Sequence, residues 1–259
     1  MLLLSIITVC RNDAARLKIT IDSLRAYYGN PRFEHIVVDG ESSDETSVLV
    51  AGLQQESNFK FVSKRDSGIY DAMNSGVGYS KAPLLLFLNC GDTVIASPNE
   101  IQDCLCNLVF EDNVVELDIA CFSVRQIGTK GYRNVMPARC AFHKMPVSHQ
   151  GMVFSRKFVA QNKYEVSYKI AGDYDLYLRA KRVEILEDLA YGPIVSVEKD
   201  GFASANPLKA YSEYLLIARK RLAGWNRVFA LFQIGIRGIC VISIKSIVPR
   251  AWVVALRGM

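Results

Sequence analysis

The first 92 residues alternate short apolar runs with stretches whose apolar residues recur at helical spacing, and this alternation constrains the fold most. Leu17, Ile21 and Leu24, for example, recur every three or four residues. Strands that alternate with helices are typical of βαβ units, which form a mainly parallel sheet flanked by helices. The predicted strands are residues 3–9, 35–38, 59–62 and 84–88, and the predicted helices are residues 14–27, 44–53 and 69–79.

Beyond residue 93 the pattern is less regular. Helices are predicted at residues 99–108 and 173–182, and β-rich stretches at residues 114–125 and 185–197. Asp44 is expected to cap the helix that follows it. Two further helices are predicted at residues 208–223 and 227–247. We therefore expect an α/β domain in residues 1–206 and a helical appendage in residues 207–259.

The appendage differs from the rest of the chain in charge. Residues 207–259 carry nine Lys or Arg and one acid, Glu213, so their formal charge is +8. Because the whole chain has a formal charge of +5, residues 1–206 carry −3. A basic and apolar segment is typical of contact with an anionic lipid surface. Residues 228–248 could span a bilayer, but a central Arg237 costs about 2.5–3.5 kcal/mol on insertion. We therefore expect a helix lying in the membrane plane; packing on the core or on a second copy is the alternative.

Cysteine usage and the N-terminus indicate a cytoplasmic location, on the inner face of the membrane. The seven cysteines form no CxxC pair, which fits reduced thiols better than disulfides or a zinc site. The first residues lack the basic region and cleavage site of a signal peptide. No nucleic-acid partner is expected, because the aromatic residues are not interleaved with Lys or Arg as stacking surfaces require. No feature of the sequence sets the oligomeric state.

Polar residues follow all four predicted strands of the first half, where open α/β sheets bind their ligands. One such group would be an ordinary turn, but four at equivalent places predict a polar crevice at one edge of the sheet. The residues are Thr8, Arg11 and Asn12, then Asp39, Gly40 and Glu41, then Asp66, Ser67 and Gly68, and finally Asn89, Cys90, Gly91 and Asp92.

The crevice lacks the usual phosphate-binding motifs. No GxGxxG follows the first strand and no GxxxxGK[ST] occurs, so neither a classical dinucleotide site nor a P-loop is expected. A phosphorylated ligand would therefore need a divalent cation, Mn²⁺ or Mg²⁺, which takes few protein oxygens and keeps positions for phosphate and water. Asp92, on a short loop after a very apolar strand, is the best-placed ligand.

Four blocks stand in order along the first 92 residues: SIITV at 5–9, VVDGESSDET at 37–46, DSGIYDAMNSG at 66–76 and FLNCGD at 87–92. Together they resemble family 2 glycosyltransferases, inverting enzymes with the GT-A fold, and most of all the bacterial exopolysaccharide branch of the colanic-acid type. Weaker similarity extends to about residue 205. The resemblance implies a nucleotide-sugar donor, most often a UDP-sugar.

Carried over by position, the resemblance implies roles for single residues. Asp39 would accept a hydrogen bond from the base of the nucleotide, while Thr8 and Asp66 would line the base and ribose pocket. Asn74 would lie near the ribose or diphosphate. The predicted donor-site residues are Thr8, Arg11, Asp39, Asp66, Gly68, Asn74 and His149.

Asp92 matches the last carboxylate of the DxD-type motif, the one that ligates the metal. Asn89 and Gly91 occupy places that are often Asp in the family. A single carboxylate, with Asn89 as a neutral ligand at best, suggests weak metal binding.

Inverting transfer also needs a base that takes the proton of the acceptor hydroxyl. Residues 171–179 (AGDYDLYLR) resemble the family motif, an Asp at the start of a helix, with Gly172 in place of the Glu that often precedes it. Asp173 is the predicted base and Asp175 the alternative, although either carboxylate could simply cap the helix. His149, in the block SHQG at 148–151, is expected either to touch the diphosphate, metal or acceptor, or to be structural.

The sequence therefore predicts a glycosyltransferase of the hexosyltransferase type. It would move a sugar from a nucleotide-sugar to a glycan or polyprenol-linked acceptor in bacterial surface polysaccharide synthesis. A non-catalytic nucleotide-sugar-binding or membrane-docking partner is one alternative, because the metal motif is thinned and Gly172 replaces a Glu. A sugar nucleotidyltransferase is another, but residues 10–13 (CRND) do not form the glycine-rich, basic loop that a triphosphate requires.

Overall fold

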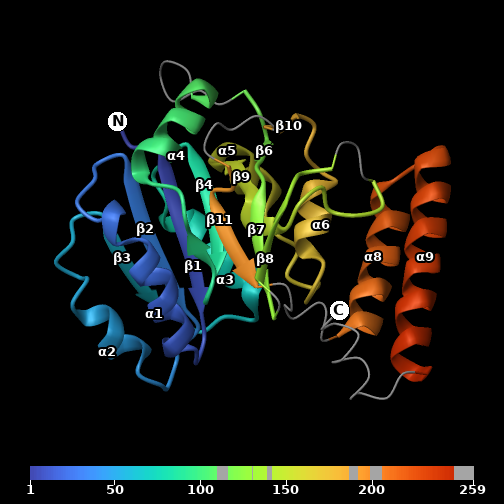
Figure 1. Cartoon of the computed structure of the whole chain (residues 1–259), viewed down its shortest axis with the longest axis horizontal. Helices are drawn as coiled ribbons and strands as arrows, with labels where there is room; N and C mark the ends of the chain where they lie inside the picture. Colours follow the sequence, from blue (N-terminus) through green and yellow to red (C-terminus); the bar gives the residue numbers. More distant parts are fainter. Residues whose placement is uncertain (110–115, 130, 139–141, 187–191, 199–205, 248–259) are drawn as a thin grey trace.

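In the computed structural model, which describes residues 1–109, 116–129, 131–138, 142–186, 192–198 and 206–247, seven strands form a central sheet in the order β10-β6-β9-β4-β1-β2-β3 (Figure 1). Strands β3, β2, β1 and β4 are parallel neighbours. Strand β9 runs antiparallel to both β4 and β6. The strands are β1 (Leu4–Cys10), β2 (Phe33–Asp39), β3 (Phe59–Ser63), β4 (Leu84–Asn89), β6 (Ile119–Cys121), β9 (Met152–Ser155) and β10 (Val183–Ile185).

The four strands predicted in the first half are confirmed, as is the mainly parallel sheet flanked by helices (Figure 1). All seven residues of β1 are buried, because helices cover both faces of the sheet. A strand buried on both faces is apolar over most of its length, which is why the sequence marks these strands so clearly.

A second, smaller sheet of the described residues has the order β5-β11-β7-β8. It comprises β5 (Thr93–Val94), β11 (Val195–Glu198), β7 (Val124–Gly128) and β8 (Gly131–Val135). The two β-rich stretches predicted beyond residue 93 are each divided between the sheets: residues 114–125 reach β6 and β7, and residues 185–197 reach β10 and β11. Residues 114, 115 and 187–191 lie outside the described residues.

Most helices within residues 1–206 are shorter than predicted, whereas α3 has the predicted bounds, residues 69–79. The segment 14–27 forms α1 (Ala14–Ser23) and then a separate 3₁₀ turn, η1 (Arg25–Tyr27). The segment 173–182 forms only α6 (Gly172–Tyr177). The others are α2 (Thr46–Ala51), α3 (Ile69–Tyr79), α4 (Pro98–Leu105), η2 (Cys106–Leu108), η4 (His149–Gly151) and α5 (Arg156–Asn162).

The sequence predicted Asp44 as the N-cap residue of α2, and this prediction is wrong. Glu45 holds that position, without a side-chain bond. Asp44 instead accepts from the N–H of Thr46 at 3.1 Å and, with its other oxygen, from the N–H of Ala14 at 2.9 Å. Its carboxylate therefore joins the beginnings of α1 and α2.

The appendage consists of α8 (Pro207–Arg221) and α9 (Gly224–Ile247), which lie side by side at one end of the molecule (Figure 1). Ala218 of α8 packs with Ala230 and Ile234 of α9. Helix α8 also packs on the α/β domain, where Tyr214 makes an edge-to-face contact with Tyr174 of α6 at 5.0 Å. None of the described helices, α9 included, combines the length and hydropathy that a bilayer crossing requires. The last residues of the appendage, 248–259, lie outside the described residues.

Candidate active site

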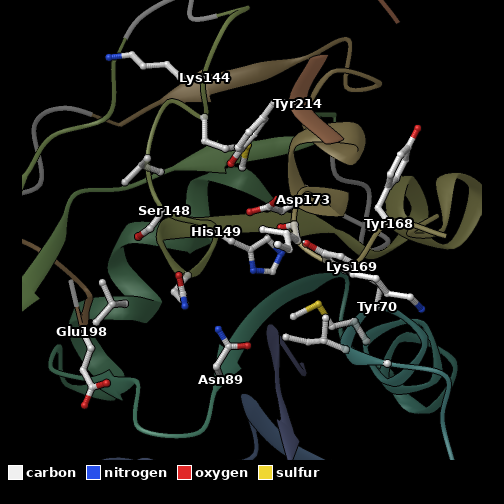
Figure 2. Close-up of a pocket in the computed structure, with 18 of the residues that line it drawn as sticks. Tyr70, Asn89, Lys144, Ser148, His149, Tyr168, Lys169, Asp173, Glu198 and Tyr214 are labelled. Carbon is white, nitrogen blue, oxygen red and sulfur yellow. The ribbon is translucent and has the colours of Figure 1, made fainter. Parts of the chain in front are cut away.

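A cavity of about 1220 Å³ lies beyond the carboxyl ends of β1 and β4. Arg11 and Asn89 line it at these strand ends, and segments 144–150 and 166–170 line it from the other side. Figure 2 shows Asn89 at the lower side of the cavity and Asp173 and Tyr214 at the upper side. Four of the predicted site residues line it, namely Arg11, Gly68, His149 and Asp173.

Three of the predicted strand-end blocks meet at Gly40. A Cβ atom at Gly40 would lie 2.6 Å from Asp66 Oδ2 and 3.2 Å from Arg11 Cδ, so a larger residue would displace the carboxylate of Asp66. Asp66 Oδ1 accepts from the N–H of Gly68 at 2.9 Å. Gly68 has a φ of +138°, a conformation that favours glycine. The structure therefore brings Arg11, Asp66 and Gly68 together at the edge of the sheet.

Asp39, at the end of β2, is buried and held by two serines. Its carboxylate accepts from the hydroxyl and the N–H of Ser42, the latter at 3.0 Å, and from the hydroxyl of Ser63 at 2.7 Å. A carboxylate offers about four acceptor positions, so these three bonds leave one on Oδ1. Asp39 does not line the cavity itself but is fixed in place beside the strand ends.

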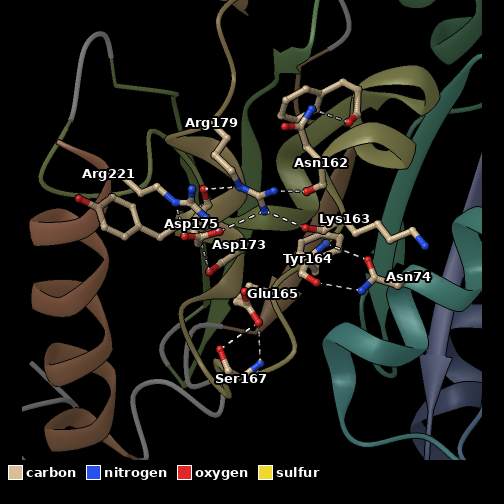
Figure 3. Close-up of polar contacts among 12 residues, drawn as sticks. Asn74, Asn162, Lys163, Tyr164, Glu165, Ser167, Asp173, Asp175, Arg179 and Arg221 are labelled. Atoms are coloured by element: carbon tan, nitrogen blue, oxygen red, sulfur yellow. Dashed lines mark hydrogen bonds and ion pairs between the residues drawn. The ribbon is translucent and has the colours of Figure 1, made fainter.

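Two predicted donor-site residues, Thr8 and Asn74, are engaged elsewhere and do not line the cavity. Thr8 is buried within β1 and its hydroxyl lies 3.0 Å from Nε2 of His35. Asn74 uses both ends of its amide on the backbone of Tyr164, donating to the C=O at 2.9 Å and accepting from the N–H at 2.8 Å (Figure 3). Its side chain therefore joins α3 to the segment that precedes α6.

Asp92, three residues after the end of β4, is buried and bonded to the backbone of Asn89. Its Oδ2 accepts from the N–H of Asn89 and from Nε2 of Gln150, both at 2.8 Å. Burial raises the pKa of Asp92 to about 6. Oδ1 of Asn89 is buried without a hydrogen-bond partner.

These oxygens have the chemistry of a Mg²⁺ or Mn²⁺ site that is completed by its ligand. Within the described parts of the chain, no three His, Cys, Asp or Glu side chains gather where they could share a metal ion. Mg²⁺ is commonly bound through one or two carboxylates together with substrate phosphates and water. The unpaired amide oxygen of Asn89 and the carboxylate of Asp92 fit that pattern, with fewer protein ligands than a closed site would need.

Asp173 lies in the first turn of α6, on the wall of the cavity. Its Oδ1 accepts from the N–H of Tyr174 at 2.8 Å. Burial raises the pKa of Asp173 to about 6. A carboxylate with a pKa close to neutral is suited to general base catalysis, because it is ionised at pH 7 yet takes a proton readily.

Asp175, the alternative base, is fully buried and held by two arginines. Nε of Arg221 on α8 lies 2.8 Å from its Oδ1, and Nη2 of Arg179 lies 3.1 Å from its Oδ2 (Figure 3). Asp175 does not line the cavity. The carboxylate of Asp175 is therefore used in ion pairs within the protein and does not reach a ligand in the cavity.

His149 borders the cavity but most of its ring is buried. Its Nε2 lies 2.6 Å from the hydroxyl of Tyr164, and its ring contacts Phe87 and Phe154. Burial lowers the pKa of His149 to about 4, so the imidazole is neutral at pH 7. The imidazole ring of His149 therefore packs against Phe87 and Phe154 and also forms an uncharged part of the cavity wall.

Several cavity residues were not predicted from the sequence. Tyr70 stands inside a block that the sequence analysis had singled out, and Gln150 inside another, so both could have been noted. Lys209 and Tyr214 come from α8, which charge and hydropathy alone assigned to a lipid surface. The unpredicted residues that line the cavity and are used below are Tyr70, Gln150, Lys169 and Tyr214.

Comparison with known proteins agrees with this geometry. Residues 5–163 match the family model described as glycosyl transferase family 2. The chain belongs to glycosyltransferase family 2. This family 2 glycosyltransferase is 33% identical over 185 residues to the uncharacterized glycosyltransferase Rv1514c of Mycobacterium tuberculosis H37Rv, covering 69% of each chain. It is 28% identical over 179 residues to the PGL/p-HBAD biosynthesis glycosyltransferase Rv2957 of the same strain, covering 68% of each.

Solved structures share the fold at low sequence identity. TarS of S. aureus (residues 1–349) in complex with UDP aligns with a TM-score of 0.69 and 17% identity, over 96% of this chain and 76% of that one. The mannosyltransferase PcManGT of Pyrobaculum calidifontis in complex with GDP-Man and Mn²⁺ aligns with a TM-score of 0.62 and 14% identity, over 98% and 78%. The predicted GT-A fold is confirmed, and the enzyme is a glycosyltransferase rather than a nucleotidyltransferase. The matched span of the family model ends before Asp173 and so does not test the predicted base.

Proposed function

We propose that this enzyme catalyses inverting transfer of a sugar from a UDP-sugar to a glycan or polyprenol-linked acceptor in bacterial surface polysaccharide synthesis. The observation that carries the proposal is that Arg11, Gly68 and Asp173 all line one cavity. The TarS structures that share the fold were solved with UDP and with UDP-GlcNAc, which supports the choice of nucleotide. Rv2957 is named for PGL/p-HBAD biosynthesis, which supports a glycan-related product.

In this proposal the nucleotide lies along the strand ends. Asp39 accepts from the base through its remaining acceptor position, and Asp66 and Gly68 bound the ribose side. Arg11, which is cationic and lies against Gly40, is placed to meet the diphosphate. We assign no donor contact to Thr8 or Asn74, whose polar groups are already paired.

A divalent cation, Mn²⁺ or Mg²⁺, would be held by Asp92 and Asn89, and when bound it would neutralise charge on the departing diphosphate. Gln150 donates to Asp92 and so orients that carboxylate. PcManGT, which shares the fold, was solved with Mn²⁺, which supports the choice of metal.

At the other side of the cavity, Asp173 accepts the proton of the acceptor hydroxyl. The hydroxyl oxygen then forms a bond to the anomeric carbon while the bond from that carbon to the diphosphate oxygen breaks. The nucleoside diphosphate leaves with that electron pair, and the configuration at the anomeric carbon is inverted. Because Asp173 is partly desolvated, its basicity suits this step at neutral pH.

We further propose that α9 places the enzyme on the inner face of the cell membrane. Its exposed apolar residues recur every three or four positions and so form one stripe along the helix. Trp225 is 86% exposed and Phe232 61% exposed, which are large apolar areas for an unpartnered surface. The stripe consists of Trp225, Val228, Phe229, Phe232, Ile236 and Ile239.

Exposed basic side chains at the end of α8 and the beginning of α9 would meet anionic headgroups at about 1 kcal/mol each. Arg219, Lys220 and Arg227 are exposed and serve this purpose. Arg221, which belongs to the same basic segment, is instead paired with Asp175.

The test of the catalytic proposal is release of free nucleotide from a panel of UDP-, GDP- and dTDP-sugars, with Mn²⁺, Mg²⁺ or EDTA, in the presence of membrane-extract acceptors. We expect metal-dependent release with UDP-sugars and a transferred sugar of inverted configuration. Tight binding of UDP-sugars without release or transfer would overturn the proposal.

A further inference from the structure

Glu213, on α8, is a buried carboxylate that accepts three hydrogen bonds from one loop of the α/β domain. Its Oε1 accepts from the N–H of Lys169 at 2.9 Å. Its Oε2 accepts from the N–H groups of Ile170 and Ala171, both at 2.9 Å. Hydrogen bonds to an ionised acceptor are roughly twice as strong as neutral ones, so three of them hold the loop firmly.

This loop leads directly into α6, the helix that carries Asp173. Ala171 is the N-cap residue of α6 and makes no side-chain cap bond. The carboxylate of Glu213, on α8, caps α6 instead. It accepts from the N–H of Ala171 and adds negative charge at the N-terminus of α6. The capping group of α6 therefore comes from a residue 42 positions further along the chain and not from the loop itself.

Two more contacts hold α8 against α6. Arg221, at the end of α8, is paired with Asp175. Tyr214, next to Glu213, packs edge-to-face on Tyr174 and also lines the cavity. The position of α6 relative to the cavity therefore depends on α8 at several points, although α8 lies beyond the span that matches the family.

We propose that Glu213 is a positioning residue for sugar transfer: by fixing the loop 169–171 it fixes the carboxylate of Asp173 in the cavity. This inference rests on the proposed role of Asp173 as the base. Glu213 itself touches no substrate, since its side chain is buried and its oxygens face the loop backbone.

The charge of Glu213 adds a second effect on the same carboxylate. The groups around Asp173 are Tyr70 from α3, Tyr164, and Tyr214 and Glu213 from α8. Burial is the main reason that the pKa of Asp173 is raised, and the charge of Glu213 acts in the same direction. Removing that charge while keeping the shape of the side chain should lower the pKa of the base.

The experiment compares Glu213→Gln and Glu213→Ala in the full chain, with Ser212→Ala as the matched control on the exposed side of α8. Gln keeps one acceptor oxygen and nearly the same volume, so Glu213→Gln should perturb the fold less than Glu213→Ala. We expect faster amide exchange at residues 169–171 in Glu213→Gln, and faster still in Glu213→Ala. A misplacement of about 1 Å costs on the order of 10²-fold in rate, so kcat should fall by about that factor while the donor KM changes less than about twofold.

The pH profile separates positioning from general destabilisation. In Glu213→Gln the acidic limb of kcat should move to lower pH, which loss of fold alone would not cause. Ser212→Ala should match the wild type in exchange, kcat and pH profile.

Two results would overturn the inference: unchanged exchange at residues 169–171 in both variants, or faster exchange with unchanged kcat. Failure of the proposed function would look different. In that case Asp173→Asn would retain full transfer, while Glu213→Gln would still loosen the loop.

Discussion

The ring of Tyr70 lies against Gly172, in the space that any side chain at position 172 would occupy. A Cβ atom there would lie 2.7 Å from Cε2 of Tyr70 and 2.8 Å from Cδ2 and Cζ. The hydroxyl of Tyr70 donates to the C=O of Ile170 at 2.7 Å, so the ring cannot easily move aside. The glycine that replaces the usual Glu is therefore matched by a tyrosine on α3, and the departure from the family motif has a packing reason.

This pairing predicts a compensating double substitution. Gly172→Ala alone should destabilise the protein by about 1–3 kcal/mol, the usual cost of overpacking a filled site. Tyr70→Ala removes the ring, so the double variant should be more stable than the sum of the two single changes predicts. Urea unfolding of the four proteins measures the coupling. Additive effects would show that Tyr70 does not restrict position 172.

Replacing Asp173 by Asn should affect activity but not stability, whereas replacing Asp175 by Asn should affect stability. Asp173→Asn should lower kcat by about 10²–10⁴-fold with little effect on stability, because it removes the base alone. Asp175→Asn leaves Arg179 and Arg221 without their carboxylate, and breaking a buried pair costs about 3–5 kcal/mol. Each serves as the control of the other when kcat and the urea midpoint are both measured. An inactive but fully stable Asp175→Asn would reverse the assignment.

The pH dependence of transfer follows from Asp173. Burial raises the pKa of Asp173 to about 6. The base acts only when ionised, so kcat should rise with pH through about 6 and level off above about 7. Measuring kcat at saturating donor and Mn²⁺ isolates this group from metal binding. The rise of kcat with pH should be absent in Asp173→Asn. If the rise remained at the same pH in this variant, it would belong to the titration of another group.

Asp92→Asn should separate metal binding from folding. The amide oxygen of Asn can accept from the same two N–H donors, Asn89 and Gln150, so the fold should be retained. Because burial raises the pKa of Asp92 to about 6, the stability linked to its protonated form is present below about pH 4 and is lost as the pH rises through 6. The variant lacks this titration, so at pH 7 its Tm should equal or exceed that of the wild type. Activation by Mn²⁺ should nevertheless be lost. Retained activation at the same Mn²⁺ concentration would exclude Asp92 as a ligand.

The membrane proposal is tested with the exposed stripe of α9. The double variant Phe229→Ser with Phe232→Ser should reduce sedimentation with anionic vesicles by about tenfold or more, since burying one Phe contributes about 1.5–3 kcal/mol. Leu216→Ser, at an exposed position of α8 outside the stripe, is the matched control. Deletion from Pro207 is not a suitable test, because it also removes Tyr214 from the cavity and Glu213 from the loop 169–171. Equal sedimentation of the variant and the wild type would contradict the role of the stripe.

The sequence by itself determined the parallel half of the sheet and the polar residues at its edge. Strands buried on both faces are apolar over most of their length, so β1 and β4 are evident from the sequence. The crevice follows because parallel strands end at the same edge. Local patterning also located both helices of the appendage to within a few residues.

Only the tertiary structure decided which of these polar groups face the cavity. Thr8 belongs to a strand that continues to Cys10, and its hydroxyl meets His35 on the neighbouring strand. Asp173 and Asp175 are two positions apart, and residues at that spacing point to different sides of a helix, so the sequence could not rank them. The choice was made by α8, which pairs Arg221 with Asp175 and holds the loop before Asp173 through Glu213. Contacts between residues more than 40 positions apart leave no local pattern in the sequence, and these contacts complete the active site.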